Sequence, residues 1–193
     1  MQTVEKSKIN LPNILTVMRI LLTPLLVIFL QRRMMTPALL VFTIAGISDG
    51  LDGFLARTFN QRTTLGAYLD PLADKLLLMS AFVSLSVLGI LPSWLAVVVI
   101  SRDILIVLGI AVCTLWHIHV VISPSKISKL TTFLQLATVF FLLLDLHFPH
   151  FDAVKAVLVW ATAVVTTASG VHYLYLGLNL LQGSEEDQQP PPG

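Results

Sequence analysis

Charged side chains are scarce in this chain of 193 residues, where they make up only 12% of the sequence. A soluble globular domain usually carries about 25% charged residues. Here 55% of the residues are hydrophobic and the mean hydropathy is +0.84. This composition is typical of an integral membrane protein. The net charge of +1 and the scattered basic residues give no indication of a nucleic-acid partner.

Cysteine is nearly absent as well, because Cys113 is the only one in the chain. A single thiol cannot form an internal disulfide, so we expect no cross-linked framework. Cys113 lies in an apolar stretch, where a small buried side chain is the usual interpretation.

Long apolar runs, by contrast, are abundant. About 20 helical residues cross the core of a bilayer, and runs of this length recur between short polar breaks. We therefore predict an all-α membrane protein with six transmembrane helices and a short amino-terminal interfacial helix. The predicted spans are Leu11–Leu30, Pro37–Arg57, Leu65–Leu88, Trp94–Trp116, Ile127–Leu146 and Val154–Leu181.

The spans predict one transmembrane domain over residues 1–182. The acidic and proline-rich tail, 183–193, is expected to be disordered because it cannot bury apolar surface. Basic residues near the span ends predict that both termini lie in the cytoplasm. The majority side would hold Lys6, Lys8, Arg57, Arg62, Lys126 and Lys129, and the other side Arg32, Arg33 and Lys155.

Aspartates are the exception to the apolar character of the spans. An ionisable group at membrane depth costs about 2.5–3.5 kcal/mol, so a functional role is its default interpretation. Helix-end carboxylates wetted by headgroup water are the alternative. Five aspartates lie within or at the edges of predicted spans: Asp49, Asp52, Asp70, Asp74 and Asp103.

Four of these aspartates have a spacing that predicts a single pocket. Asp49 and Asp52 stand three residues apart, and Asp70 and Asp74 stand four apart. Each pair therefore lies on one face of its helix, with Cβ atoms about 5–6 Å apart. The polar turn at residues 58–64 lets the two helices run antiparallel and brings the pairs face to face.

Four converging carboxylates need a counter-charge, or some of them must take up protons. Few basic residues stand close enough in sequence to neutralise them, although Arg57 and Lys75 could each offset one. One or two divalent cations would resolve the repulsion. Oxygen ligands select Mg²⁺ or Mn²⁺, and the lack of a nearby Cys or His argues against zinc. Paired divalent ions suit displacement at phosphorus.

Eight positions across residues 49–74 form a recognisable pattern: Asp49, Asp52, Gly53, Ala56, Arg57, Gly66, Asp70 and Asp74. They resemble the signature of the CDP-alcohol phosphatidyltransferase family, whose members transfer a substituted phosphoryl group from a CDP-linked donor to an alcohol and release CMP. The resemblance implies six transmembrane helices and metal binding by the four aspartates, with Asp74 also acting as general base. It further implies nucleotide contacts from Asp52, Gly53, Ala56, Arg57 and Gly66.

Residues 69–75 and 10–20 resemble the bacterial phosphatidylglycerophosphate synthase and CMP-forming cardiolipin synthase branch. This resemblance implies CDP-diacylglycerol as donor and the bacterial inner membrane as location. With the orientation expected from the basic residues, the active site would face the cytoplasm. Arg102-Asp103, with no further arginine a turn or two later, and residues 123–135 look more like the cardiolipin synthases. Phosphatidylglycerol is therefore the expected acceptor. Glycerol 3-phosphate is the alternative, because Lys126 and Lys129 could bind a phosphorylated acceptor.

Several interpretations stay open at this point. Arg102 is either a contact for the acceptor or a lipid phosphate, or one half of an ion pair between helices. Arg19 could approach the acidic site or reach lipid headgroups by snorkelling. A homodimer is compatible with the sequence. A proton-coupled transporter or channel would also use intramembrane aspartates, but the second half of the chain does not repeat the acidic first half.

Overall fold

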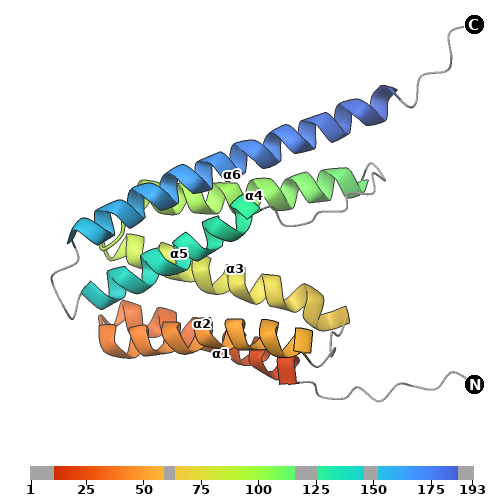
Figure 1. Ribbon diagram of the computed structural model, residues 1–193. Coiled ribbons are helices and arrows are strands. Elements are labelled where there is room, and N and C mark those ends of the chain that lie inside the picture. The colour runs from red at the N-terminus through yellow and green to blue at the C-terminus, as the bar shows by residue number, and fades with distance from the viewer. Residues whose placement is uncertain (1–10, 59–63, 116–125, 146–151, 187–193) are drawn as a thin grey trace, which may run out of the picture. The chain divides into compact units, whose positions relative to one another are not determined.

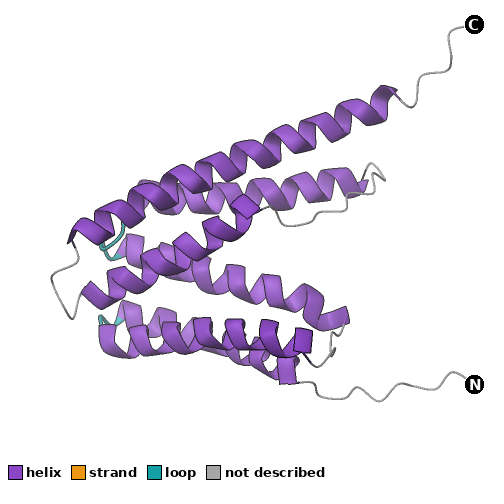
Figure 2. Ribbon diagram, in the orientation of Figure 1, coloured by secondary structure: helices purple, strands orange, loops and turns teal. Residues whose placement is uncertain are grey.

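The computed structural model describes residues 11–58, 64–115, 126–145 and 152–186. Within these ranges every regular element is an α-helix (Figures 1 and 2). The helices are α1 (Leu11–Gln31), α2 (Met35–Thr58), α3 (Thr64–Val87), α4 (Ser93–Leu115), α5 (Lys126–Asp145) and α6 (Asp152–Glu186). The all-α prediction is confirmed, and eleven of the twelve predicted helix ends lie within two residues of the observed ones.

The carboxyl end of α6 is the exception, because this helix continues to Glu186. Residues 183–186, predicted to belong to a disordered tail, are therefore helical. Extending an existing helix costs little, and glutamate is a good helix former. Residues 187–193 lie outside the described part of the chain, as do residues 1–10 with the predicted interfacial helix. The single domain over 1–182 and the disorder of the remaining tail stay predictions.

The described helices form two compact units. The first unit contains α1, α2, α3 and the end of α5 from Val139, and in it α1 packs against both α2 and α3. Figure 1 shows these three helices side by side. Their core combines large side chains with alanines, which let helices approach closely; it includes Leu26, Leu30, Ala38, Ala45, Leu77, Ala81 and Phe82.

The second unit contains α4, the first part of α5 up to Thr138, and α6. In this unit α4 packs against α6, and the Trp94 ring contacts the Trp160 ring in a tilted arrangement with centroids 5.4 Å apart. Hydroxyl groups join α5 to α6, since Thr138 Oγ1 lies 2.8 Å from Thr162 Oγ1 and both threonines are buried. Such hydrogen bonds satisfy polar groups that an apolar environment would otherwise leave unpaired.

Large apolar side chains also cover the outward faces of the helices. Leu21 of α1, Ile47 of α2, Val107 of α4 and Val157 of α6 are all more than half exposed. Two helices of the described part are long and apolar enough to cross a membrane, over Ile127–Leu144 and Asp152–Gly177, and only 33% of each stretch is buried. Shorter apolar stretches cover Thr16–Gln31 and Met35–Gly50. The count of six spans therefore stays a prediction.

Candidate active site

The candidate active site lies in the first unit, where α2 and α3 both pack around α1. Asp49 lies on α2 and Asp74 on α3, and each side chain is about one-third exposed, at 36% and 33%. The two carboxylates are separated by 25 positions in the sequence, yet both reach the same residue of α1. One member of each predicted aspartate pair therefore points to a common place.

That residue is Arg19, whose side chain is completely buried. Its two terminal nitrogens bind different carboxylates: Nη2 lies 3.0 Å from Asp49 Oδ1, and Nη1 lies 2.9 Å from Asp74 Oδ1. A guanidinium is planar and carries its donors in a rigid fork, so two bonds from one fork fix the two carboxylates relative to each other. Arg19 thus ties α1 to both α2 and α3.

The position of Arg19 decides between its two interpretations, because the side chain approaches the acidic site. Snorkelling to headgroups is wrong for this residue, because a side chain with no exposed surface does not reach the interface. Arg19 also supplies a counter-charge that is not among the close sequence neighbours of the aspartates, while the offsets expected from Arg57 and Lys75 stay predictions. Arg19 lies 55 positions before Asp74, and only helix packing makes them neighbours. The rule that drew attention to the aspartates, an ionisable group within an apolar span, applies equally to Arg19.

The other residues of the signature are placed by their backbones alone. They lie in the carboxyl-terminal half of α2 and in the first turns of α3, so the spacing that puts each aspartate pair on one helix face holds. Their side chains lie outside the described part, and their roles stay predictions: Asp52, Gly53, Ala56, Arg57, Gly66 and Asp70.

The donor set suits a hard divalent cation. Asp49 and Asp74 present carboxylate oxygens from two helices, and both side chains remain accessible. Oxygen donors of this kind are those that Mg²⁺ and Mn²⁺ prefer. Among the described side chains, which do not include Asp52 and Asp70, no group of three metal-ligating residues comes together. The two described carboxylates fit a metal site by their chemistry.

A second charged cluster surrounds Arg102 in the second unit. Arg102 and Asp103 are both buried, and Arg102 Nη1 donates to Asp103 Oδ1 at 2.7 Å. The guanidinium also donates to Ser128 Oγ of α5 at 2.8 Å and to Ser169 Oγ of α6 at 2.9 Å. The Tyr173 ring centroid lies 5.8 Å from its central carbon. Arg102 therefore joins three helices.

This cluster changes the interpretation of Arg102. The ion pair forms with its own neighbour on α4, while the bonds between helices go to serines. With several donors bound to protein groups and little exposure, Arg102 is better suited to holding helices together than to binding a lipid phosphate. Lys129 is exposed near the beginning of α5, and the side chain of Lys126 lies outside the described part.

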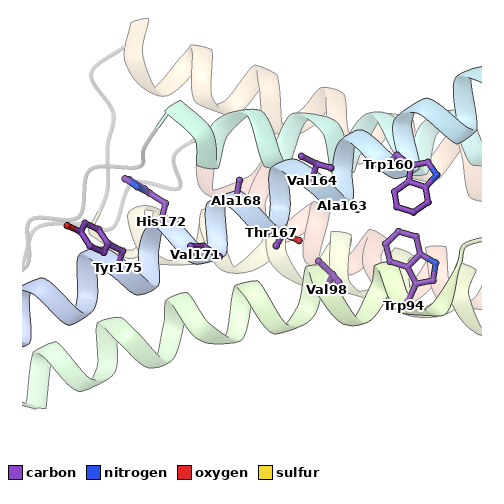
Figure 3. A pocket seen from close by; sticks show the side chains of 10 residues that line it. All are labelled: Trp94, Val98, Trp160, Ala163, Val164, Thr167, Ala168, Val171, His172 and Tyr175. Carbon is purple, nitrogen blue, oxygen red and sulfur yellow. The ribbon is translucent and has the colours of Figure 1, made fainter.

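An open groove of about 880 Å³ runs along α4 and α6 in the second unit (Figure 3). Its walls are mostly apolar, with the two tryptophans toward one end and His172 and Tyr175 toward the other (Figure 3). Apolar walls suit hydrocarbon rather than a charged nucleotide. The groove is therefore not the expected site for the CDP group.

These features define an all-helical, largely apolar protein with carboxylates converging on a buried arginine. The family model for CDP-alcohol phosphatidyltransferases matches residues 9–168. The chain belongs to this family, as its signature implied. It is thus an enzyme of phospholipid synthesis, from a membrane-associated family that generally depends on a divalent metal.

Relatives with names of two kinds resemble the chain over most of its length. It is 36% identical over 182 residues to a probable phosphatidylglycerophosphate synthase from Mycobacterium tuberculosis, covering 90% of this chain and 84% of that protein. It is 34% identical over 190 residues to the cardiolipin synthase (CMP-forming) of Homo sapiens, covering 90% and 63%. A CDP-diacylglycerol--glycerol-3-phosphate 3-phosphatidyltransferase from Bacillus subtilis is 31% identical over 189 residues, covering 85% and 93%.

Proposed function

We propose that this enzyme transfers a phosphatidyl group from CDP-diacylglycerol to phosphatidylglycerol, which forms cardiolipin and releases CMP. The observation that carries the choice of acceptor is the enclosure of Arg102. The phosphate of glycerol 3-phosphate carries close to two negative charges and needs accessible cations. The guanidinium of Arg102 is instead bonded to Asp103, Ser128 and Ser169.

Glycerol 3-phosphate is the second candidate acceptor. One relative is named as a probable phosphatidylglycerophosphate synthase and another as a glycerol-3-phosphate 3-phosphatidyltransferase. The exposed Lys129 offers a cation near the start of α5. Lys126, close to it on α5, is a second candidate contact for a phosphate on the acceptor or on a lipid, and Arg102 stays the least favoured of the three. The chain belongs to a family of enzymes, so we do not propose a transporter or channel function.

In the proposed reaction the acceptor hydroxyl attacks the phosphatidyl phosphorus, and the bond from this phosphorus to the CMP oxygen breaks. Asp74 accepts the hydroxyl proton, which suits a partly exposed carboxylate at the site. Asp49, Asp52, Asp70 and Asp74 would hold the metal, Mg²⁺ or Mn²⁺ and in our proposal two ions, and would so help to bind the donor pyrophosphate. When bound, these ions stabilise negative charge on the attacking and leaving oxygens. Gly53, Ala56, Arg57 and Gly66, with Asp52, contact the cytidine nucleotide.

We further propose six membrane spans, with both termini and the active site on the cytoplasmic side of a bacterial inner membrane. The apolar outward faces of α1, α2, α4 and α6 support contact with lipid on these helices. Membrane lipids would then surround the described helices. The same arrangement leaves room for a homodimer within the membrane.

The proposal is tested by CMP release from the purified full chain with CDP-diacylglycerol, Mg²⁺ or Mn²⁺, and either phosphatidylglycerol or glycerol 3-phosphate. We expect release with phosphatidylglycerol and loss of activity when a chelator removes the metal. Asp74→Asn should lower kcat by roughly 10²–10⁴-fold, the usual contribution of a general base. Asp152→Asn is the matched control, because the Asp152 side chain is 90% exposed and pairs locally with Lys155.

Three outcomes would count against parts of this proposal. Release with glycerol 3-phosphate alone would exchange the acceptor for the second candidate. Full activity without divalent metal would remove the metal from the mechanism. An Asp74→Asn variant as active as the Asp152→Asn variant would show that Asp74 is not the base.

A further inference from the structure

We infer that Arg19 and a divalent cation are alternative partners of Asp49 and Asp74, so that loading the metal displaces the guanidinium from these carboxylates. The inference rests on the proposed function in one respect, the assignment of both aspartates as metal ligands. It adds a role for a buried residue of α1 that the signature of α2 and α3 does not include.

The guanidinium of Arg19 already neutralises part of the negative charge of Asp49 and Asp74. It binds Oδ1 of Asp49 at 3.0 Å and Oδ1 of Asp74 at 2.9 Å. A cation held between the same two side chains would lie within a few ångström of these nitrogens. Like charges at such a distance repel, and the burial of the guanidinium limits how far water and salt screen the repulsion.

Arg19 can relieve this repulsion by moving. A guanidinium keeps its charge in proteins, so proton loss does not relieve the repulsion. The side chain is long and has several rotatable bonds, and its two bonds to the carboxylates are among the contacts that hold it in place. Asp49 and Asp74 are each about one-third exposed, so an arriving ion reaches the carboxylates without first passing the buried guanidinium.

Replacement of Arg19 should have two opposite effects. Without its charge, two partly buried carboxylates lose a shared counter-charge, and the metal-stripped protein should lose stability. The same variant should bind a divalent cation more tightly, because the guanidinium no longer competes for the oxygens. A residue that only oriented the carboxylates for the metal would give the opposite result, since its loss would weaken metal binding.

Mn²⁺ binding to the metal-stripped full chain tests the inference. Free Mn²⁺ is followed by electron paramagnetic resonance in the wild type, Arg19→Gln and Arg19→Lys. We expect Arg19→Gln to bind Mn²⁺ at least about tenfold more tightly, as removal of a nearby like charge implies, and to gain more in Tm on Mn²⁺ addition. Arg19→Lys keeps the charge and should stay close to the wild type. Equal or weaker binding by Arg19→Gln would overturn the inference.

A measurement on the wild-type chain covers the case in which Arg19→Gln does not fold. The guanidinium nitrogen signals of Arg19, assigned by their loss in Arg19→Lys, are recorded by NMR as Mg²⁺ is added. Release from two carboxylates should shift these signals and speed rotation of the guanidinium group. Unchanged signals at saturating Mg²⁺ would contradict displacement.

The same titrations separate failure of this inference from failure of the proposed function. If Asp49→Asn and Asp74→Asn bind Mn²⁺ as the wild type does, the metal site itself is misassigned. If both variants lose Mn²⁺ while Arg19→Gln binds no more tightly than the wild type, the metal site stands and only the competition with Arg19 is wrong.

Discussion

The side chain of Arg102 contacts four other side chains of the second unit. Asp103 balances its charge, Ser128 and Ser169 accept further hydrogen bonds, and the Tyr173 ring centroid lies 5.8 Å from its central carbon. Both charged side chains are below 10% exposure. A buried pair of this kind adds little net stability against apolar replacements, but removal of one partner leaves the other charge without its counter-ion.

We therefore expect Arg102→Met to destabilise the protein by about 3–5 kcal/mol, the typical cost of breaking a buried ion pair. The double variant Arg102→Met with Asp103→Asn should recover part of this loss, because the buried carboxylate that lost its ion pair with Arg102 is gone. Thermal or denaturant unfolding in detergent measures both variants.

Lys129→Met supplies the control for Arg102, because it removes a basic residue that is exposed. It should change stability by less than about 0.5 kcal/mol, as expected for a surface substitution. If Arg102→Met proves as stable as Lys129→Met yet raises the KM for the acceptor, Arg102 binds the acceptor and does not serve to hold the helices together.

The sequence could indicate which charged residues are important, but not which other side chains they contact. Asp49 and Asp74 stand out because carboxylates are costly in apolar spans. Their partner, Arg19, belongs to another helix, and no local spacing connects it to them. The same holds for Arg102: its ion pair with the adjacent Asp103 could be suspected from the sequence, whereas its bonds to serines on α5 and α6 could not.

The helices end in ways that their sequences explain only in part. After α3, Gly89 has φ of 72°, and the Ile90 amide donates to the Leu85 carbonyl while the Gly89 amide donates to Ser86. This pattern is the Schellman motif, in which glycine is preferred at the left-handed position. After α1 the same motif occurs with Arg33, a non-glycine residue with φ of 56°.

The two motifs predict opposite effects of substitution. Arg33→Gly should stabilise the protein by about 1 kcal/mol, because the left-handed conformation costs a residue with a Cβ atom roughly that much. Gly89→Ala should cost a similar amount. Space is not the reason, because a Cβ atom at Gly89 would have no neighbour within 4 Å. Thermal unfolding of both variants checks the two signs.

Arg32→Gly is the matched control for Arg33→Gly. It removes the same charge from the same connection, but Arg32 is not among the residues with positive φ. It should therefore give no gain in stability. An equal gain for both variants would mean that charge, not backbone conformation, explains the effect at Arg33.

Helix ranges were predictable because hydrophobic runs and their polar breaks are local features. Each break between described helices contains polar, glycine or proline residues that interrupt an apolar run. The end of α6 was not predictable on this basis. Its last residues are polar, but helix propagation through Glu185 and Glu186 does not depend on an apolar partner.

At the scale of the whole molecule, the main feature is that many large apolar side chains lie exposed on the outer faces of the helices. Helices of both units carry large exposed hydrophobic side chains, among them Leu40, Val87, Val97 and Val164. Contiguous apolar surface is rare on soluble monomers and marks contact with other apolar material, so exposed side chains of this kind on several helices fit a membrane protein. Within the described part only α5 and α6 pass the length and hydropathy requirements for a span, so the span count needs a direct test.

Reporter fusions distinguish six spans from two. Six spans place a reporter fused after Arg33 or after Leu91 on the side opposite both chain ends. If α5 and α6 alone cross the membrane, these two fusions report the same side as the ends. We expect the first result, with alkaline phosphatase active after Arg33 and Leu91 and inactive at the carboxyl end. A fusion after residue 60, in the break between α2 and α3, serves as control and should match the ends.

The sequence by itself determined the helical class, nearly all helix ends and the signature of the family, because apolar runs, polar breaks and residue spacing are features of one segment at a time. Only the tertiary structure decided which charges meet. Arg19 reaches Asp49 and Asp74 because α1 packs against both α2 and α3, and Arg102 reaches Ser128 and Ser169 because α5 and α6 approach α4. Contacts between helices depend on how side chains of distant segments pack, and this information is not present in any one segment.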